Sequence, residues 1–299
     1  MENKQNLLGM KWSIEGLSTG DAFGDSLFFS RRGFNSTERA LPSAIWEYTD
    51  DTQMALSIIE TLKQFGKIDQ GYLAESFAKH FEAHRGYGLA MYELLPALNS
   101  KNWKFLSTRL FNGQGSYGNG GAMRVAPLGA FFAEDMDKVI ENARLSAEVT
   151  HAHPEGIAGA IAVAVSTAIA WQLRQNNALP SPKTFLEKIA SFTPPSIVQD
   201  KILLASSLSP GQPIWEIIKV LGNGSGISAQ DTVPFATWCA SQHLDSFPEA
   251  LWLTASGHGD MDTNCAIVGG IVATYTGLEG IPTEWIRRRE KLPDWLAGI

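Results

Sequence analysis

The chain has 299 residues, of which 44% are hydrophobic and 18% are charged, a composition typical of a folded globular protein with a sizeable core. Its formal net charge is -7, which argues against a surface that holds long stretches of nucleic acid through phosphate contacts. A small polar pocket for a nucleotide remains compatible with this charge.

Helical periodicity dominates the chain. Met54, Ile58, Leu62 and Phe65 recur at helical spacing and predict an amphipathic helix after Thr52. The same pattern predicts further helices, in chain order, at residues 70–82, 136–146, 155–175, 183–190, 213–221, 233–240, 248–255 and 265–276. Alternating runs of β-branched residues, which indicate strands, are nearly absent. We therefore expect an all-α fold in which residues 1–299 form a single domain.

Three long segments that contain glycine, residues 30–48, 109–122 and 222–232, are predicted loops between helices, and loops of this kind often carry function. The apolar stretch 156–171 is short for a bilayer and includes Ser166 and Thr167, so it predicts a buried central helix and no membrane span. The charged tail at residues 287–299 has no pattern that predicts how it packs.

Cysteine usage and the N-terminal residues bear on the cellular compartment. Cys239 and Cys265 form no CxxC pair and no disulfide framework, which favours two reduced, buried thiols. Residues 1–12 contain no apolar core of signal-peptide length. We expect a cytoplasmic protein.

Two acidic clusters stand directly before predicted helices. The first is Thr49-Asp50-Asp51-Thr52, and the second is Asp260-Met261-Asp262-Thr263. Asp and Thr are common helix caps, which is the plain structural interpretation of either cluster alone. Adjacent carboxylates repel each other unless a cation lies between them, and hard divalent cations prefer such oxygen ligands. If the two helix starts face each other, four carboxylates and threonine hydroxyls could bind two metal ions. A helix-loop-helix calcium site is excluded, because the positions that need Gly and Glu are Cys265 and Ile271.

The segment from Gly113 to Gly118 matches GxGxxG, which alone is weak evidence for nucleotide binding. A Rossmann interpretation fails, because the preceding segment is irregular and Pro127 falls where the motif's helix should run. The glycines still permit close backbone approach, so a ligand with a pyrophosphate is plausible at this loop. His151 and His153 are two residues apart, unlike a helical zinc pair, and the functional interpretation is one polar contact to a ligand.

Five segments together resemble the ADP-ribosylglycohydrolase family, in sequence and in order. They read GLSTGDAFG at 16–24, TDDT at 49–52, GSYGNGGAMRVAPLG at 115–129, THAHP at 150–154 and GDMDT at 259–263. The resemblance implies a compact orthogonal bundle of helices with two magnesium or manganese ions. The implied metal ligands are Thr49, Asp50, Asp51, Asp260, Asp262 and Thr263. The implied contacts to ADP-ribose come from Gly115, Ser116, Tyr117, Gly118, Asn119 and His151.

The resemblance also implies a reaction. Two metal ions can bind the ribose hydroxyls and polarise a water molecule, and Asp50, Asp51 or Asp260 could accept the proton of that water. Family members commonly carry a Glu near the substrate at the position held here by Phe28. Phe28 could stack on a ribose or base but cannot transfer a proton, and Glu38 in the next loop could replace the missing acid.

Three functions are compatible with these residues. The first is a hydrolase that removes ADP-ribose from a modified protein, with an arginine linkage favoured, ADP-ribose as product and no membrane partner. The second is a catalytically silent relative that binds ADP-ribose, which the intact metal ligands argue against. The third is an antitoxin that caps an ADP-ribosyltransferase, and the short stretch before the first motif leaves little room for an added arm.

Overall fold

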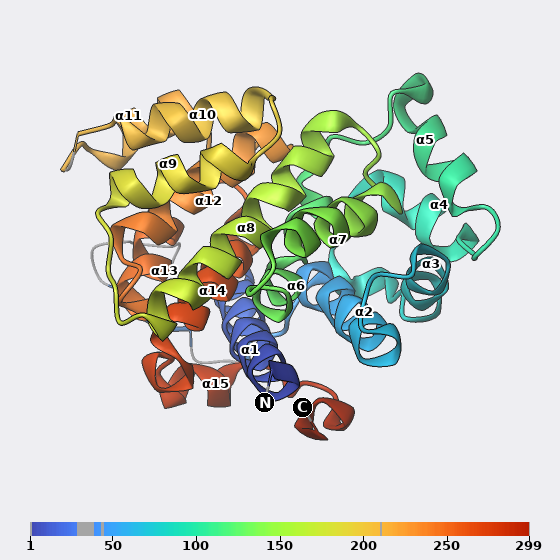
Figure 1. Cartoon of the computed structure of the whole chain (residues 1–299), viewed down its shortest axis with the longest axis horizontal. Coiled ribbons are helices and arrows are strands. Elements are labelled where there is room, and N and C mark those ends of the chain that lie inside the picture. Colours follow the sequence, from blue (N-terminus) through green and yellow to red (C-terminus); the bar gives the residue numbers. More distant parts are fainter. Residues whose placement is uncertain (1, 29–38, 43–44, 210, 299) are drawn as a thin grey trace.

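The computed structural model describes residues 2–28, 39–42, 45–209 and 211–298, and helices make up its regular structure (Figure 1). The α-helices are α1 (Glu2–Phe28), α2 (Asp50–Phe65), α3 (Gln70–Lys79), α4 (Leu89–Ala97), α5 (Trp103–Gly113), α6 (Ala126–Phe131), α7 (Met136–Glu148), α8 (Pro154–Gln175), α9 (Pro182–Phe192), α10 (Ile197–Ser206), α11 (Ile214–Leu221), α12 (Ala229–Gln242), α13 (Phe247–Ser256), α14 (Met261–Thr276) and α15 (Thr283–Arg288). Short 3-10 turns are η1 (Ala83–Arg85), η2 (Asn119–Gly121), η3 (Leu278–Gly280) and η4 (Asp294–Gly298). Over these residues, β pairing is limited to two isolated bridges. The predicted all-α fold is confirmed.

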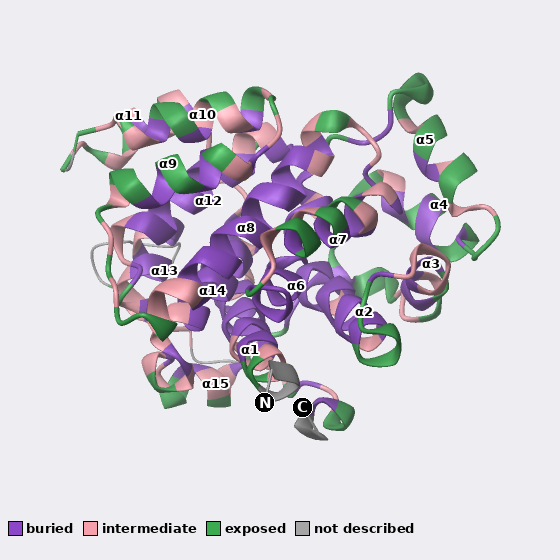
Figure 2. Cartoon of the chain, in the orientation of Figure 1, coloured by how far each residue is buried: buried purple, intermediate pink, exposed green. Residues whose placement is uncertain are grey.

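Helix α8 lies at the centre of the molecule, with α2 to α5 on one side and α9 to α11 on the other (Figure 1). It is long and apolar enough to cross a membrane, but 83% of its apolar window is buried inside the protein. Figure 2 shows α8 and α14 mostly buried, while α10 and α11 expose one face. The prediction of a buried central helix is therefore confirmed.

A stripe of glycines brings α1 and α14 into backbone contact. Gly16, Gly20 and Gly24 recur every four residues, so they share one face of α1. A Cβ atom on Gly20 would lie 2.1 Å from the carbonyl oxygen of Cys265, and one on Gly24 would lie 2.3 Å from that of Met261. Any larger residue would separate the two helices. This contact fixes Asp21, the residue after Gly20, beside the start of α14.

Several elements differ from their predictions. Helix α3 ends at Lys79, before the predicted end at residue 82. The predicted loop at 109–122 contains the end of α5, where Phe111 and Asn112 have left-handed φ angles of 51° and 60°, and the turn η2. The sequence patterns did not predict α1, α4, α5, α6, α10 or α15. Of the predicted loop at 30–48, residues 30–38 and 43–44 lie outside the described part of the chain.

Candidate active site

Five aspartates from three helices meet at one place. Asp21 lies in α1, Asp50 and Asp51 begin α2, and Asp260 and Asp262 stand at the start of α14. The Thr263 hydroxyl lies 3.4 Å from Oδ2 of Asp51, which joins the two predicted acidic clusters directly. The two helix starts therefore face each other, which is the condition on which the hypothesis of a two-metal site depended.

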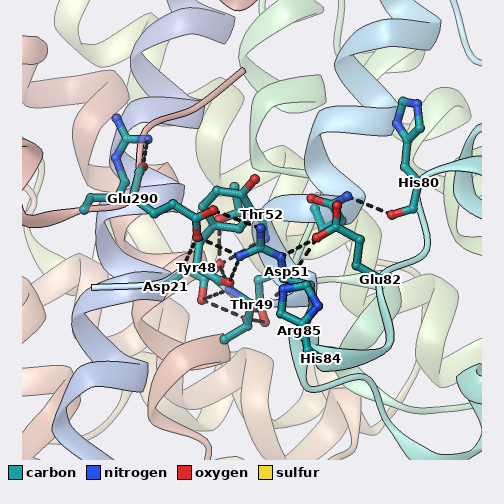
Figure 3. Close-up of polar contacts among 12 residues, drawn as sticks. Asp21, Tyr48, Thr49, Asp51, Thr52, His80, Glu82, His84, Arg85 and Glu290 are labelled. Atoms are coloured by element: carbon teal, nitrogen blue, oxygen red, sulfur yellow. Dashed lines mark hydrogen bonds and ion pairs between the residues drawn. The ribbon is translucent and has the colours of Figure 1, made fainter. Parts of the chain in front are cut away.

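Asp21 organises the first cluster, and sequence reasoning assigned it no role. Its carboxylate accepts hydrogen bonds from the backbone amides of Thr49 and Thr52, both at about 3.1 Å, and from both threonine hydroxyls at 2.8 and 2.5 Å (Figure 3). It thus satisfies free amides in the first turn of α2 from outside that helix. The available signal was Asp21 within the GLSTGDAFG segment, one residue after a glycine that lets α1 approach its neighbour.

The carboxylates of this cluster repel one another. Burial, with repulsion from Asp262, raises the pKa of Asp21 to about 7 and that of Asp260 to about 8. Burial and the neighbouring carboxylates raise the pKa values of Asp50 and Asp51 well above the ordinary range. In the absence of a cation the cluster therefore favours proton uptake, because like charges this close in a buried site cannot all ionise cheaply.

A cation–carboxylate cluster lies beside the contacts of Asp21 with Thr49 and Thr52 (Figure 3). Arg85 donates to both carboxylate oxygens of Glu290, at 2.7 and 2.9 Å, and to the backbone carbonyl of Tyr48 at 2.8 Å. The Arg85 guanidinium also lies over the Tyr48 ring, 4.0 Å from its centre. The amide of Glu290 donates to the carbonyl of Trp46 at 2.7 Å. The C-terminal segment is thereby attached to the residues that lead into Thr49 and Asp50.

The acidic cluster opens into a cavity of about 620 Å³, a size suited to a nucleotide-like ligand. Asp50, Asp260, Asp262 and Thr263 line one part of it. The glycine-rich segment forms another wall, which comprises Ser116, Tyr117, Gly118, Asn119 and Gly120. The side-chain amide of Asn119 donates to Asp260 at 2.6 Å and so ties this wall to the carboxylates.

The two histidines of THAHP have different roles. His151 lines the cavity, and burial together with the nearby Arg124 lowers its pKa to about 3. His153 caps α8, because its Nδ1 accepts a hydrogen bond from the amide of Glu155 at 3.1 Å. The structure thus separates a cavity residue from a structural one.

Not every predicted site residue reaches the cavity wall. Asp51 and Thr49 are buried and do not line the cavity. Gly115 is needed for packing, since a Cβ atom there would lie 2.7 Å from the amide nitrogen of His153 and its φ is +76°. Phe28 ends α1 with 49% of its surface exposed and does not line the cavity, and Glu38 lies outside the described residues.

The donor set suits hard divalent cations. Oδ1 of Asp51 and Oδ1 of Asp262 are buried atoms with no hydrogen-bond partner, which is costly unless something positive binds there. The surrounding donors are carboxylate and hydroxyl oxygens, the ligands that magnesium and manganese prefer. As the described side chains stand, no three His, Cys, Asp or Glu residues are already grouped around one ion position. The residues fit such ions in chemistry and charge.

Comparison with known proteins identifies the class. Residues 11–299 match the family described as ADP-ribosylglycohydrolase. A solved structure, "ADP-ribosylglycohydrolase-related protein complex", has the same fold with a TM-score of 0.65 at 22% identity, covering 96% of this chain and 94% of that chain. The chain is therefore a glycosidic-bond hydrolase. Within that class it belongs to the ADP-ribosylglycohydrolase family.

Individual relatives are similar over most of their length. ADP-ribosylhydrolase ARH3 of Gallus gallus is 32% identical over 273 residues, which cover 80% of this chain and 72% of the relative. The ARH3 of Homo sapiens is 30% identical over 272 residues, with 80% and 73% covered. An uncharacterized protein of Archaeoglobus fulgidus is 29% identical, with 91% of this chain and 88% of the relative covered.

Proposed function

We propose that this enzyme removes ADP-ribose from a modified protein side chain with the help of two divalent cations, magnesium or manganese. The observation that carries the proposal is the convergence of three helix segments, each bearing aspartates, at one part of a nucleotide-sized cavity. The proposed ligands are Thr49, Asp50, Asp51, Asp260, Asp262 and Thr263. Such ions, when bound, would fix the ribose hydroxyls and lower the pKa of a nearby water.

The protein's own groups bind and orient the substrate. Of the three candidate bases, Asp50 and Asp260 line the cavity, whereas Asp51 does not. We assign proton acceptance to Asp50 or Asp260, because a base must lie within hydrogen-bond reach of the proton that it takes. Asn119 holds Asp260 in place through the 2.6 Å hydrogen bond.

Two aromatic residues of the cavity lining suit the adenosine diphosphate of the substrate. Phe111 and Tyr117 line the cavity with exposed rings whose centres are 6.2 Å apart at an angle of 30°. Exposed aromatic faces are favourable stacking partners for a nucleobase. The wall from Ser116 to Asn119, with His151 beside it, would then contact the diphosphate and ribose.

For the linkage we propose ADP-ribosyl-arginine. Asp25, one turn beyond Asp21 in α1, also faces Asp262, and burial with this repulsion raises its pKa to about 6. The carboxyls of this end, Asp21, Asp25, Asp50, Asp51, Asp260 and Asp262, outnumber the four positive charges of two divalent ions. A cationic guanidinium leaving group is attracted to such a site. A serine linkage is the second candidate, because the segment GSYGNGGAMRV resembles the serine-directed branch of the family.

One experiment tests both levels of the proposal. Two peptides that differ only in the linked residue, arginine or serine, are incubated with the enzyme, with Mg²⁺ and with EDTA, and free ADP-ribose is measured. We expect release that requires Mg²⁺, is faster from arginine and is lost in Asp260→Asn. Asp245→Asn is the matched control, because this aspartate is exposed and does not line the cavity.

Each other outcome favours a specific alternative. Faster release from serine would reverse the linkage assignment and leave the hydrolase intact. Tight ADP-ribose binding without release from either peptide would indicate a silent binding protein. Inhibition of an ADP-ribosyltransferase by Asp260→Asn protein, with no release of ADP-ribose, would indicate an antitoxin that acts by contact.

A further inference from the structure

Arg124 is a buried cation that the proposed reaction does not use. Its exposed fraction is 0%, and burial lowers its pKa to about 9. Its guanidinium lies over the Phe77 ring, 4.6 Å from the centre, and donates to the carbonyl of Ser146 at 2.9 Å. In the described part of the chain, no carboxylate lies within ion-pair distance of it. A buried charge without such a partner costs stability, so its position calls for a functional reason.

We relate the buried position of Arg124 to its contact with the hydroxyl of Thr150. Arg124 also donates to Sδ of Met54 at 3.7 Å and to Oγ1 of Thr150 at 2.9 Å. The same Oγ1 lies 2.7 Å from Nδ1 of His151, and Thr150 is fully buried. The contacts therefore form a chain from the guanidinium through the hydroxyl to the imidazole.

The chemistry of each group fixes the direction of this chain. A guanidinium has only donors, so Oγ1 must be the acceptor of its contact with Arg124. The hydroxyl proton of Thr150 then needs an acceptor of its own, and Nδ1 of His151 is the one within reach. If Nδ1 carried a proton, the hydroxyl proton would be buried without a partner, at a cost that proteins avoid. Nδ1 is therefore unprotonated, and the ring proton of the neutral imidazole lies on Nε2.

We propose that Arg124 and Thr150 are positioning residues that hold His151 as the neutral Nε2–H tautomer, which presents a hydrogen-bond donor to an anionic ligand group in the cavity. The part that concerns the ligand rests on the function proposed above. Nε2 lies next to the glycine-rich wall: a Cβ atom on Gly118 would be 3.2 Å from it, and one on Gly120 would be 3.0 Å away.

The low pKa of His151 agrees with this assignment. Burial and the charge of Arg124 lower it to about 3, so the ring is neutral at physiological pH. A neutral donor retains its direction without adding a second buried positive charge beside Arg124. It would bind a phosphate oxygen through a fixed N–H group, as a backbone amide does.

The tautomer is directly measurable by ¹⁵N NMR on the ligand-free, full-length protein, with the His151 signal assigned by its loss in His151→Gln. We expect the shifts of a neutral imidazole with a protonated Nε2 and an unprotonated Nδ1 at pH 7. A protonated Nδ1 would overturn the proposal without any variant. This measurement does not depend on ADP-ribose, so it distinguishes failure of this inference from failure of the proposed function.

Two variants of Thr150 test the relay. Thr150→Val removes the hydroxyl at nearly constant volume, and Thr150→Ser retains it. We expect Thr150→Val to shift His151 toward the Nδ1–H tautomer or a mixture, and to weaken ADP-ribose binding in calorimetry by about tenfold, the loss of one hydrogen bond to a charged group. Thr150→Ser should preserve both the tautomer and the affinity. An unchanged tautomer in folded Thr150→Val protein, or an equal change in Thr150→Ser, would contradict the relay.

Discussion

The contact between Arg85 and Glu290 makes a sharp prediction about how the C-terminal segment supports the site. Glu290→Gln keeps the shape of the side chain but removes its charge. It also places an amide group next to the guanidinium of Arg85. Arg85 is 8% exposed, so it would lose its bidentate partner inside the protein and retain Glu82, at 3.1 Å, as its carboxylate contact. The backbone contact of Glu290 with Trp46 would remain. The substitution therefore tests the side-chain contact of Glu290 separately from its backbone contact.

The expected loss of stability in Glu290→Gln depends on how far the Arg85–Glu290 contact is buried. Hydrogen bonds to charged groups contribute about 1.5–3 kcal/mol each when buried. The Glu290 side chain is 31% exposed, so solvent screens part of this, and glutamine retains one acceptor. We expect a loss of about 1–3 kcal/mol in the free energy of unfolding. For a chain of this size, about 2 °C in Tm corresponds to 1 kcal/mol, so Tm should fall by about 2–6 °C.

The assay is thermal unfolding at pH 7, followed by circular dichroism, with Glu284→Gln as the matched control. Glu284 forms an ion pair with Arg288 at 2.6 Å, but its side chain is 62% exposed. Its loss should cost about 0.3–0.5 kcal/mol. Equal Tm values for the two variants would refute the reasoning that Glu290 supports the site. Binding of Mn²⁺ should also weaken in Glu290→Gln and stay unchanged in Glu284→Gln.

The pH dependence has a definite sign. Burial alone would raise the pKa of Glu290, but the hydrogen bond and charge of Arg85 hold it below its ordinary value. A carboxyl with a lowered pKa stabilises the fold above its unfolded pKa of about 4.3 and loses that effect as the pH falls through the folded value. The difference in stability between the parent and Glu290→Gln should therefore shrink on acidification below about pH 4. A difference that grows on acidification would contradict the assignment.

Three further predictions concern the site itself. Asp262→Asn should weaken Mn²⁺ binding at least about tenfold in calorimetry, yet leave the metal-free protein as stable or more stable, because it removes a charge that repels Asp21 and Asp50. EDTA should lower Tm by about 5 °C relative to protein at 100 times the metal Kd, which corresponds to about 2.7 kcal/mol, and an unchanged Tm would count against a metal site. Gly118→Val should weaken ADP-ribose binding at least about tenfold, because its added carbons would crowd Nε2 of His151, whereas affinity equal to the parent would exclude this wall from ligand contact.

The carboxylate clusters were predictable from sequence because their signal is local. Paired Asp and Thr residues directly before an amphipathic pattern indicate both a helix start and an unusual concentration of charge. Asp21 was not predictable in the same way, since it caps α2 from another helix, 28 residues away from Thr49. The hydrogen-bond partners of Asp21 depend on how α1 packs on α2 and α14, and no local sequence pattern predicts that packing.

Helix α1 was missed for a related reason. Gly16, Gly20 and Gly24 lower its intrinsic helix propensity, at about 1 kcal/mol each relative to alanine. The close packing against α14 that these glycines allow offsets this cost, so the tertiary contact overrides the local preference. The packing of the C-terminal tail was also not predicted, because Glu290 looks like an ordinary surface residue by pattern and becomes partly buried only beside Arg85.

For the proposed substrate, the distribution of charge along the cavity favours one orientation. At one end, the carboxylates repel one another unless a cation binds, and two of their buried oxygens lack any partner. At the glycine-rich wall, His151 is backed by the buried Arg124, whose charge is not neutralised by a nearby carboxylate in the described residues. A ligand that carries metal-binding hydroxyls at one end and a diphosphate beside the wall satisfies both ends at once. Reversing it would place the diphosphate among the carboxylates and leave the donors of the wall unpaired. The same polarity would hold the bond to the target next to Asp50 and Asp260, where a proton acceptor is available.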